Sequence, residues 1–176
     1  MVIFVVLWIK VGKLLMEDLN EFIGQAKTAL DEKGRTPVPR EFRRVLSDEE
    51  CESLIVSFGE ADSLILWTIE EYRKFTAHLE ARPATKKNID FRRRFKANSH
   101  LVVLDKQNRI LLSKDDKVRA KLEGEVLYVA RSGKSAELWN PVIYNSKFGF
   151  NSEEDLKEFD DGFFDDVSSG SADENR

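Results

Sequence analysis

The segment Leu30-Asp31-Glu32-Lys33-Gly34-Arg35 recurs later in the chain as Leu104-Asp105-Lys106-Gln107-Asn108-Arg109. Both copies fit the pattern Leu-Asp-x-x-x-Arg, and Asp105 follows Asp31 by 74 residues. Aromatic residues close the two halves in the same order: Trp67, Tyr72 and Phe75, then Trp139, Tyr144 and Phe148. Trp139 follows Trp67 by 72 residues, so the register of the repeat holds. A repeat of this length is longer than in most solenoid families, which favours a twofold duplication over an open array.

Each copy predicts strands around a turn, followed by a short helix, a hairpin and a longer helix. The first half is expected to contain a strand at Ala26–Leu30, a turn at Asp31–Gly34, a strand at Arg35–Val38, a short helix from Pro39, a hairpin of Leu54–Val56 with Leu64–Leu66, and a helix after Thr68. The second half is expected to contain Leu101–Leu104, a turn at Asp105–Asn108, Arg109–Leu112, a short helix at Asp116–Leu122, a hairpin of Val126–Ala130 with Ala136–Trp139, and a helix from Pro141. Gly34 suits a positive φ, Pro39 suits the first position of a helix, and Thr68 suits a helix N-cap.

Composition limits the class of protein. Hydrophobic residues make up 41% of the 176 residues and charged residues 34%, which fits a folded chain with a well-solvated surface. The single cysteine, Cys51, excludes an internal disulfide framework and a cysteine-rich metal site. His78 and His100 occupy unrelated positions of the repeat and are interpreted as partly exposed polar residues. No metal or other cofactor is therefore expected.

The charge is unevenly distributed along the chain. The formal net charge is −4, but residues 151–176 hold ten acidic residues and two basic ones. Residues 1–150 hold 26 basic and 22 acidic residues, so this part is mildly basic. The acidic end has few aliphatic side chains and is expected to be disordered.

The first residues are apolar but do not suit a membrane. Met1–Ile9 is a β-rich apolar run, whereas a spanning helix needs about twenty residues. A signal peptide has positive charge before its apolar run and small residues after it, and neither is found here. Met16 is an internal methionine, so residues 1–15 are interpreted either as an upstream-start artefact or as a short extra strand or interaction tail. A cytoplasmic protein is expected.

The paired Asp and Arg of each turn carry the functional interpretation. Across a tight turn, an Asp accepts backbone N–H bonds and pairs with the arginine, which fixes the direction of the guanidinium group. An arginine held in this way suits bidentate bonds to guanine or to a phosphate. Lys33, Lys106 and Gln107 add donors on the same turns. A single copy would be interpreted as an exposed ion pair worth under about 1 kcal/mol, but matched positions in both halves favour double-stranded DNA as the ligand.

The order and spacing of several motifs over residues 20–148 resemble the MraZ family of bacterial transcriptional regulators. The motifs are Phe22-x-Gly24, Leu30-Asp31-x-Lys33-Gly34-Arg35, Pro39-x-x-Phe42-Arg43, Trp67, Phe91-Arg92-Arg93-Arg94-Phe95, Leu104-Asp105-x-Gln107-x-Arg109-Ile110 and Glu137-x-Trp139. The resemblance implies an α+β fold in which a duplicated β-α-β module forms a swapped-hairpin, AbrB-like β-barrel with flanking helices. It also implies ring-shaped homo-oligomers that bind repeated promoter sites upstream of division and cell-wall genes through the Asp-x-x-x-Arg loops.

The expected organisation has five parts: an N-terminal extension (1–19), a first SpoVT-AbrB-like module (20–81), a basic helical linker (82–98), a second such module (99–148) and an acidic tail (149–176). Two departures from the family pattern lie in the second module. Asn108 replaces Gly34 and Ser113 replaces Pro39, so the second turn is expected to be less rigid or less well matched to DNA. The basic run Phe91–Lys96 has an open interpretation: it is either a phosphate contact or a solvated linker helix.

Trp67 and Trp139 could stack on bases, but their equivalent positions at strand ends favour core or interface residues.

The sequence predicts a nucleoid-associated, DNA-binding transcriptional regulator. The residues expected to contact DNA are Asp31, Lys33, Arg35, Asp105, Gln107 and Arg109. An alternative is a ring-forming assembly protein that has lost or weakened DNA binding, as marked by the acidic tail and the altered second turn. The tail itself is interpreted either as inert or as a competitor of DNA for the basic surface. An enzyme is not expected, because each turn aspartate has an arginine nearby that keeps it ionised, and the chain shows no nucleophile–base pair and no phosphate-binding glycine loop.

Overall fold

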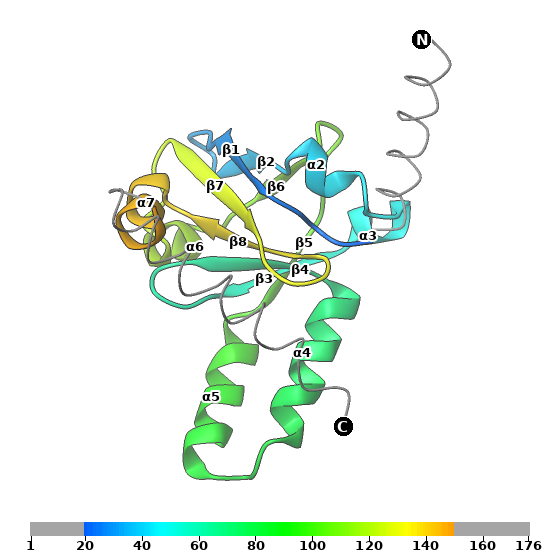
Figure 1. Ribbon diagram of the computed structural model, residues 1–176, viewed down its shortest axis with the longest axis vertical. Helices are drawn as coiled ribbons and strands as arrows, with labels where there is room; N and C mark the ends of the chain where they lie inside the picture. The colour runs from blue at the N-terminus through cyan, green and yellow to red at the C-terminus, as the bar shows by residue number, and fades with distance from the viewer. Residues whose placement is uncertain (1–19, 150–176) are drawn as a thin grey trace, which may run out of the picture. The chain divides into compact units, whose positions relative to one another are not determined.

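The computed structural model describes residues 20–149, so the predictions for the N-terminal extension and the acidic tail fall outside the described residues. Pairs of strands alternate with one or two helices along this part of the chain (Figure 1). The first half contains β1 (Gln25–Ala29), β2 (Arg35–Pro37), α2 (Arg40–Arg43), α3 (Asp48–Glu52), β3 (Leu54–Phe58), β4 (Leu64–Thr68) and α4 (Ile69–Ala81). The second half contains α5 (Lys86–Ala97), β5 (His100–Val102), β6 (Arg109–Leu111), α6 (Lys114–Arg119), β7 (Glu125–Ala130), β8 (Ser135–Trp139) and α7 (Pro141–Phe148).

The expected α+β class is confirmed, and so are the paired strands of both hairpins. Thr68 caps α4 by accepting a bond from the backbone N–H of Glu71, as its position predicted. Ser113 caps α6 and forms a reciprocal capping box with Asp116, at the N-cap position that Pro39 occupies before α2. Helix α3 was not predicted. Its signal is also a capping box, formed by Ser47 and Glu50.

The strands of the two halves are interleaved. Six strands form one antiparallel sheet in the order β1-β7-β8-β4-β3-β5, and β2 pairs separately with β6. Strand β1 of the first half pairs with β7 of the second, and β5 of the second half pairs with β3 of the first. Each half therefore gives the first strand of its module to the hairpin of the other half. Among the described residues the ladders leave β1 and β5 as edges of the larger sheet, so the expected closed barrel is not confirmed.

One large core joins both halves because their strands are exchanged. Phe22 stacks on Phe42 with ring centroids 4.8 Å apart, and Phe42 in turn meets Tyr128. Ile110 and Leu112 from the second half lie in the same cluster as Val38 from the first. Neither half could bury these side chains alone, so the fold depends on both copies of the module.

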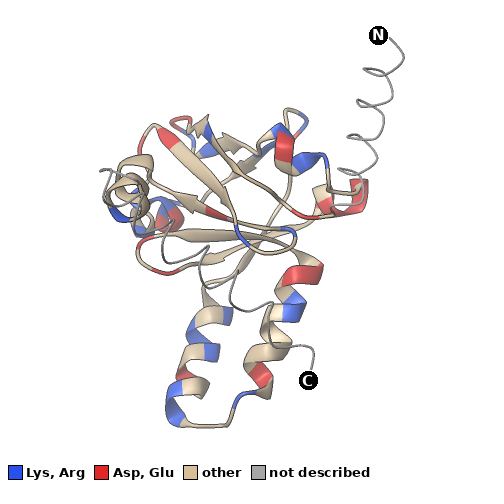
Figure 2. Cartoon of the chain, viewed as in Figure 1, with Lys and Arg blue, Asp and Glu red and all other residues tan. Residues whose placement is uncertain are grey.

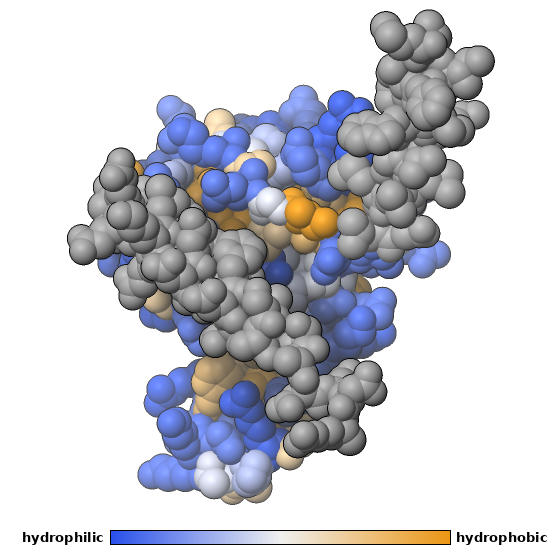
Figure 3. Space-filling view, viewed as in Figure 1, coloured by the Kyte–Doolittle hydropathy of each residue, from blue (hydrophilic) through white to orange (hydrophobic). Residues whose placement is uncertain are grey.

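A second, aromatic cluster attaches the helix pair α4–α5 to the sheet. The ring centroid of Trp67 on β4 lies 5.0 Å from that of Phe75 on α4, and the Phe75 centroid lies 5.0 Å from that of Phe95 on α5. Figure 1 shows the two helices side by side, extending away from the sheet. In the view of Figure 3 hydrophilic side chains lie along this pair and residues of intermediate hydropathy lie at its far end, whereas the more apolar side chains appear mainly where it meets the sheet. The pair is thus fixed at its base and exposed at its tip.

Helix α7 enters a separate compact unit that begins at Val142. Within that unit the rings of Tyr144 and Phe148 lie 5.3 Å apart. Over residues 20–149, no helix has both the length and the apolar composition that a membrane crossing requires.

Candidate nucleic-acid interface

The first Asp–Arg turn is held by four hydrogen bonds. Asp31 accepts the backbone N–H of Arg35 on Oδ1 at 2.8 Å and Arg35 Nε on Oδ2 at 2.7 Å. The backbone adds Asp31 N to Arg35 O at 2.9 Å and Gly34 N to Asp31 O at 2.9 Å. Gly34 has a φ of +83°, the conformation that its type predicted. One carboxylate therefore fixes both the backbone and the guanidinium of Arg35.

The second turn repeats this arrangement and extends it. Asp105 accepts Arg109 N at 3.0 Å, and its Oδ2 accepts both Arg109 Nε at 2.8 Å and Arg109 Nη2 at 2.7 Å. The backbone N–H of Gln107 donates to the same carboxylate at 2.8 Å. Asn108 takes a φ of 58° where the first turn has glycine. Six hydrogen bonds hold the second turn, so Asn108 leaves its bonding intact. The expected poorer match of this turn to DNA stays a prediction.

Both carboxylates are stabilised in the charged form. The Arg35 backbone N–H is the main group that lowers the pKa of Asp31 below its ordinary value. The hydrogen bonds from the Arg109 side chain lower the pKa of Asp105 to about 2. Because both carboxylates are partly exposed, their lowered pKa values contribute little to the stability of the fold. They show instead that each carboxylate is charged and bonded to its arginine.

The β2–β6 pair brings the two turns together. Arg35 lies opposite Leu111, and Pro37 lies opposite Arg109. Side chains alternate across a strand, so Thr36 and Ile110, both fully buried, face the core while the two arginines share the outer face. Arg109 Nη1 lies 4.0 Å from Asp31 Oδ2, which links the turns directly. Residues 74 apart in the sequence thus form one surface.

The remaining predicted residues lie at the tips of the turns. Lys33 and Gln107 are both exposed, as are the neighbouring Lys106 and Asn108. The structure therefore brings all six predicted residues into two adjoining turns. The two Asp–Arg pairs are partly exposed, and Lys33 and Gln107 are fully on the surface.

Two basic residues beside the turns were not predicted as site residues. Lys117 of α6 lies so near Gly34 that a Cβ added there would be 3.5 Å from Lys117 Nζ. Arg43 of α2 donates from Nε to the carbonyl of Val38 at 3.0 Å, next to the bond from Val38 N to Asn108 O. Arg43 and Lys117 are themselves 74 residues apart, so the repeat offset was the signal that could have found them.

The basic run on α5 lies elsewhere. Figure 2 shows its blue residues on the extended helix pair, away from the β2–β6 strands. Arg93 pairs with Asp90 at 3.2 Å, and Arg92 donates to the carbonyl of Glu80. These contacts favour the linker interpretation over a shared surface with the turns.

Trp67 and Trp139 are core residues, as preferred from the sequence, because each is 2% exposed. Trp67 Nε1 donates to Ser57 Oγ at 2.8 Å, and Trp139 Nε1 donates to Glu137 Oε2 at 2.8 Å. Neither ring is available to stack on a base. Among residues 20–149 no group of three or more metal-ligating side chains is assembled.

Comparison with known proteins gives matches over most of the chain. A family model described as MraZ protein matches residues 22–94. A "Transcriptional regulator MraZ" of Thermoanaerobacter sp. (strain X514) is 31% identical over 144 residues, which cover 79% of this chain and 96% of that protein. Proteins of the same name from Acetivibrio thermocellus (strain ATCC 27405) and Burkholderia cenocepacia (strain HI2424) are 32% and 33% identical over 129 residues each. These alignments cover 73% and 72% of this chain, and 87% of each relative.

Proposed function

The chain belongs to the MraZ family, and from this membership we propose that it is a sequence-specific DNA-binding transcriptional regulator whose two Asp–Arg turns contact DNA. The observation that carries the proposal is the placement of Arg35 and Arg109 on one face of the β2–β6 pair. Each guanidinium is oriented by a carboxylate that stays ionised at neutral pH. Arginine directed in this way suits the two acceptors on the major-groove edge of guanine.

The spacing of the arginines fits a short stretch of groove. Arg35 and Arg109 are diagonal neighbours in an antiparallel pair, which places such positions about 7–8 Å apart. Successive bases along one strand are about 3.4 Å apart, so the two arginines would reach bases about two steps apart. One chain would then recognise only a short element. Repeated elements in a promoter would need several chains side by side, and their weak contacts would add up.

The finer parts of the proposal follow from the family resemblance. The two halves would form a swapped-hairpin barrel of the AbrB type, built from modules at 20–81 and 99–148 with a basic linker at 82–98, and the exchange of β1 and β5 supports this. Copies of the chain would assemble into a ring in the cytoplasm, at the nucleoid, and bind promoter repeats upstream of division and cell-wall genes. Exposed Val103 and Val118 provide apolar surface for such an assembly.

The test replaces Arg35 and measures binding of the assembled protein to its own upstream DNA. Arg35→Ala removes a bidentate contact worth about 1–3 kcal/mol, so binding should weaken by roughly 5-fold to 150-fold while the oligomer remains. Arg93→Ala is the matched control, because it also removes an arginine paired with a nearby aspartate but lies on α5. An intact Arg35→Ala oligomer that binds as tightly as the wild type would refute the assignment of Arg35.

A second candidate is an assembly protein without DNA binding, which the ten acidic residues of 151–176 and the Asn108 of the second turn favour. A salt series separates the two functions. Phosphate contacts make affinity fall steeply with salt, with a slope of about −0.9 per contact on a log–log plot. No binding at low salt, by the full chain or by a chain ending at residue 150, would support the assembly protein.

A further inference from the structure

Leu111 is an exposed apolar side chain on the same outer face as the two arginines. It is 57% exposed, whereas Ile110 beside it on β6 is fully buried. Strand alternation turns Ile110 toward the core and leaves Leu111 on the surface with Arg35 and Arg109. A single exposed leucine is ordinary in itself, so the argument rests on the position of this one.

Leu111 is the direct cross-strand neighbour of Arg35. The backbone bonds Leu112 N to Gly34 O, at 2.8 Å, and Val38 N to Asn108 O, at 2.9 Å, mark the hydrogen-bonded positions of this pair of strands. Arg35 and Leu111 therefore form a non-hydrogen-bonded pair, in which the side chains of antiparallel strands come closest. A ligand group held by the Arg35 guanidinium would have an apolar side chain beside it.

The major groove offers one apolar group at the base edges, the C5 methyl of thymine. We propose that Leu111 contacts the methyl group of a thymine next to the guanine that Arg35 binds, so that this residue adds a specificity for thymine. This inference rests on the proposed function. By the pairing of the strands, Pro37 is the corresponding neighbour of Arg109, but it is only partly exposed. The two arginines of one chain would then read unequal elements, with the thymine preference beside Arg35.

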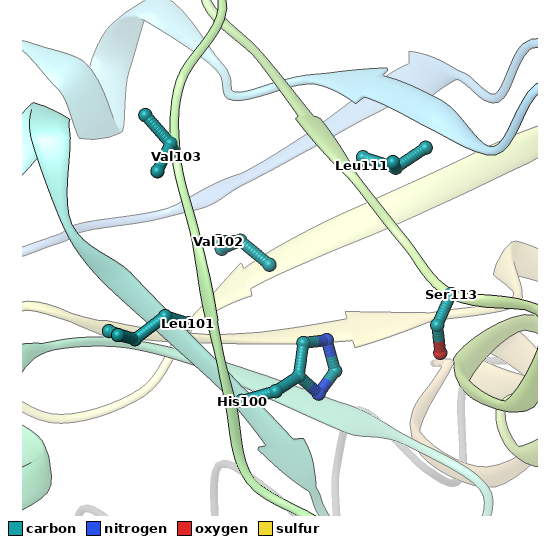
Figure 4. Close-up of a pocket in the computed structure, with 6 residues that line it drawn as sticks. All are labelled: His100, Leu101, Val102, Val103, Leu111 and Ser113. Atoms are coloured by element: carbon teal, nitrogen blue, oxygen red, sulfur yellow. The ribbon is translucent and has the colours of Figure 1, made fainter.

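A competing occupant for Leu111 is a second copy of the chain. Leu111 also lines an open groove of about 410 Å³ together with Ser113 and residues 100–103. Figure 4 shows Leu111 and Ser113 on one side of this groove and His100–Val103 on the other. Leu101 of β5 is 66% exposed, and in Figure 4 its side chain points away from Leu111. Its cross-strand partner is Ile55 and not an arginine. Leu101→Ala is therefore the matched control for Leu111→Ala.

The experiment removes the methyl group from the DNA and the leucine from the protein. A duplex selected in vitro with the full wild-type chain is resynthesised with 2′-deoxyuridine in place of one thymine at a time, which deletes only the methyl group. At one position the wild-type Kd should rise about fourfold, the worth of one buried methyl group. Leu111→Ala should lose this effect at that same position, and Leu101→Ala should keep it. 7-Deazaguanine at the neighbouring guanine should weaken binding by all three proteins.

The outcomes separate the inference from the proposed function. If 7-deazaguanine weakens binding but no thymine position is coupled to Leu111, the methyl contact is wrong and guanine recognition stands. If Leu111→Ala changes the oligomeric state seen by mass photometry, Leu111 belongs to an interface between copies and the inference is overturned. If the wild type selects no duplex, both proposals fail.

Discussion

Arg109 Nη1 lies 4.0 Å from Asp31 Oδ2, so the arginine of the second turn reaches the carboxylate of the first. Asp31 also accepts Arg35 Nε at 2.7 Å and so serves both arginines. In the described part of the chain, the hydrogen bonds of the Asp105 carboxylate stay within its own turn, with Gln107 and Arg109. The two aspartates occupy matched positions but have unequal roles.

The first prediction follows from this inequality. Asp31→Asn should weaken DNA binding several-fold more than Asp105→Asn, because it releases Arg35 and removes a charge beside Arg109, whereas the second change affects Arg109 alone. Both substitutions keep the size of the side chain, and the turn aspartates are partly exposed, so stability should change little. Titration of labelled promoter DNA at fixed salt measures the effect. Equal losses from the two variants would show that the contact between the turns has no role.

The second prediction concerns acid titration of the second turn. The pKa of Asp105 is lowered from 3.8 to about 2, so its interaction with Arg109 is fully present above about pH 4 and is lost as the pH falls through about 2. Carboxyl carbon NMR should place the midpoint of Asp105 near 2 in the wild type. Arg109→Gln should move that midpoint up toward 3.8. A wild-type midpoint near 3.8 would contradict the bonding seen in the turn.

The third prediction separates the structural role of Trp67 from base stacking. Trp67→Phe removes the donor to the fully buried Ser57 hydroxyl and should lower the free energy of unfolding by about 1–3 kcal/mol. DNA affinity should be unchanged at a temperature where the variant is folded. Adding Ser57→Ala should recover part of the loss, because the unsatisfied hydroxyl is then absent. A large loss of DNA affinity without loss of stability would instead make Trp67 a contact to a base.

Sequence patterns predicted the local elements well because local chemistry determines them. Gly34, Thr68 and the expected hairpin of Leu54–Val56 with Leu64–Leu66 each carry a signal within a few residues, and the corresponding turn, helix and hairpin are all found. The exchange of β1 and β5 between the halves has no such signal. Which strands pair depends on how the two halves bury their apolar side chains together, and those side chains lie far apart in the sequence. The swapped arrangement was therefore expected from the family resemblance and not from periodicity.

The candidate site was predictable in its parts but not in its assembly. The repeat identified Asp31, Arg35, Asp105 and Arg109, and the spacing predicted the two turns. Their union on one face depends on the pairing of β2 with β6, and no local pattern in the sequence indicates which strands pair. The exposed Leu111 also could not be recognised, because Arg109–Leu112 was expected as a strand with no defined partner.

The last prediction concerns the backbone of the two turns. A Cβ at Gly34 would lie 2.7 Å from the carbonyl oxygen of Leu112, whose own N–H is bonded to Gly34 O, so the neighbour cannot move without loss of that bond. Gly34→Asn, which installs the residue used by the second turn, should therefore lower the free energy of unfolding by more than the roughly 1 kcal/mol of a positive φ alone. Asn108→Gly should cost under about 1 kcal/mol, chiefly from the entropy of the unfolded chain.

Gly124 provides the matched control, since its φ is +69° and a Cβ there would have nothing within 4 Å. Chemical denaturation at one protein concentration should show a larger loss for Gly34→Asn than for Gly124→Asn, and the difference isolates the collision with Leu112. Equal losses of unfolding free energy would mean that the Leu112 carbonyl moves aside to admit the new Cβ. The two turns would then be interchangeable in sequence, and the glycine of the first turn would owe its place to φ alone.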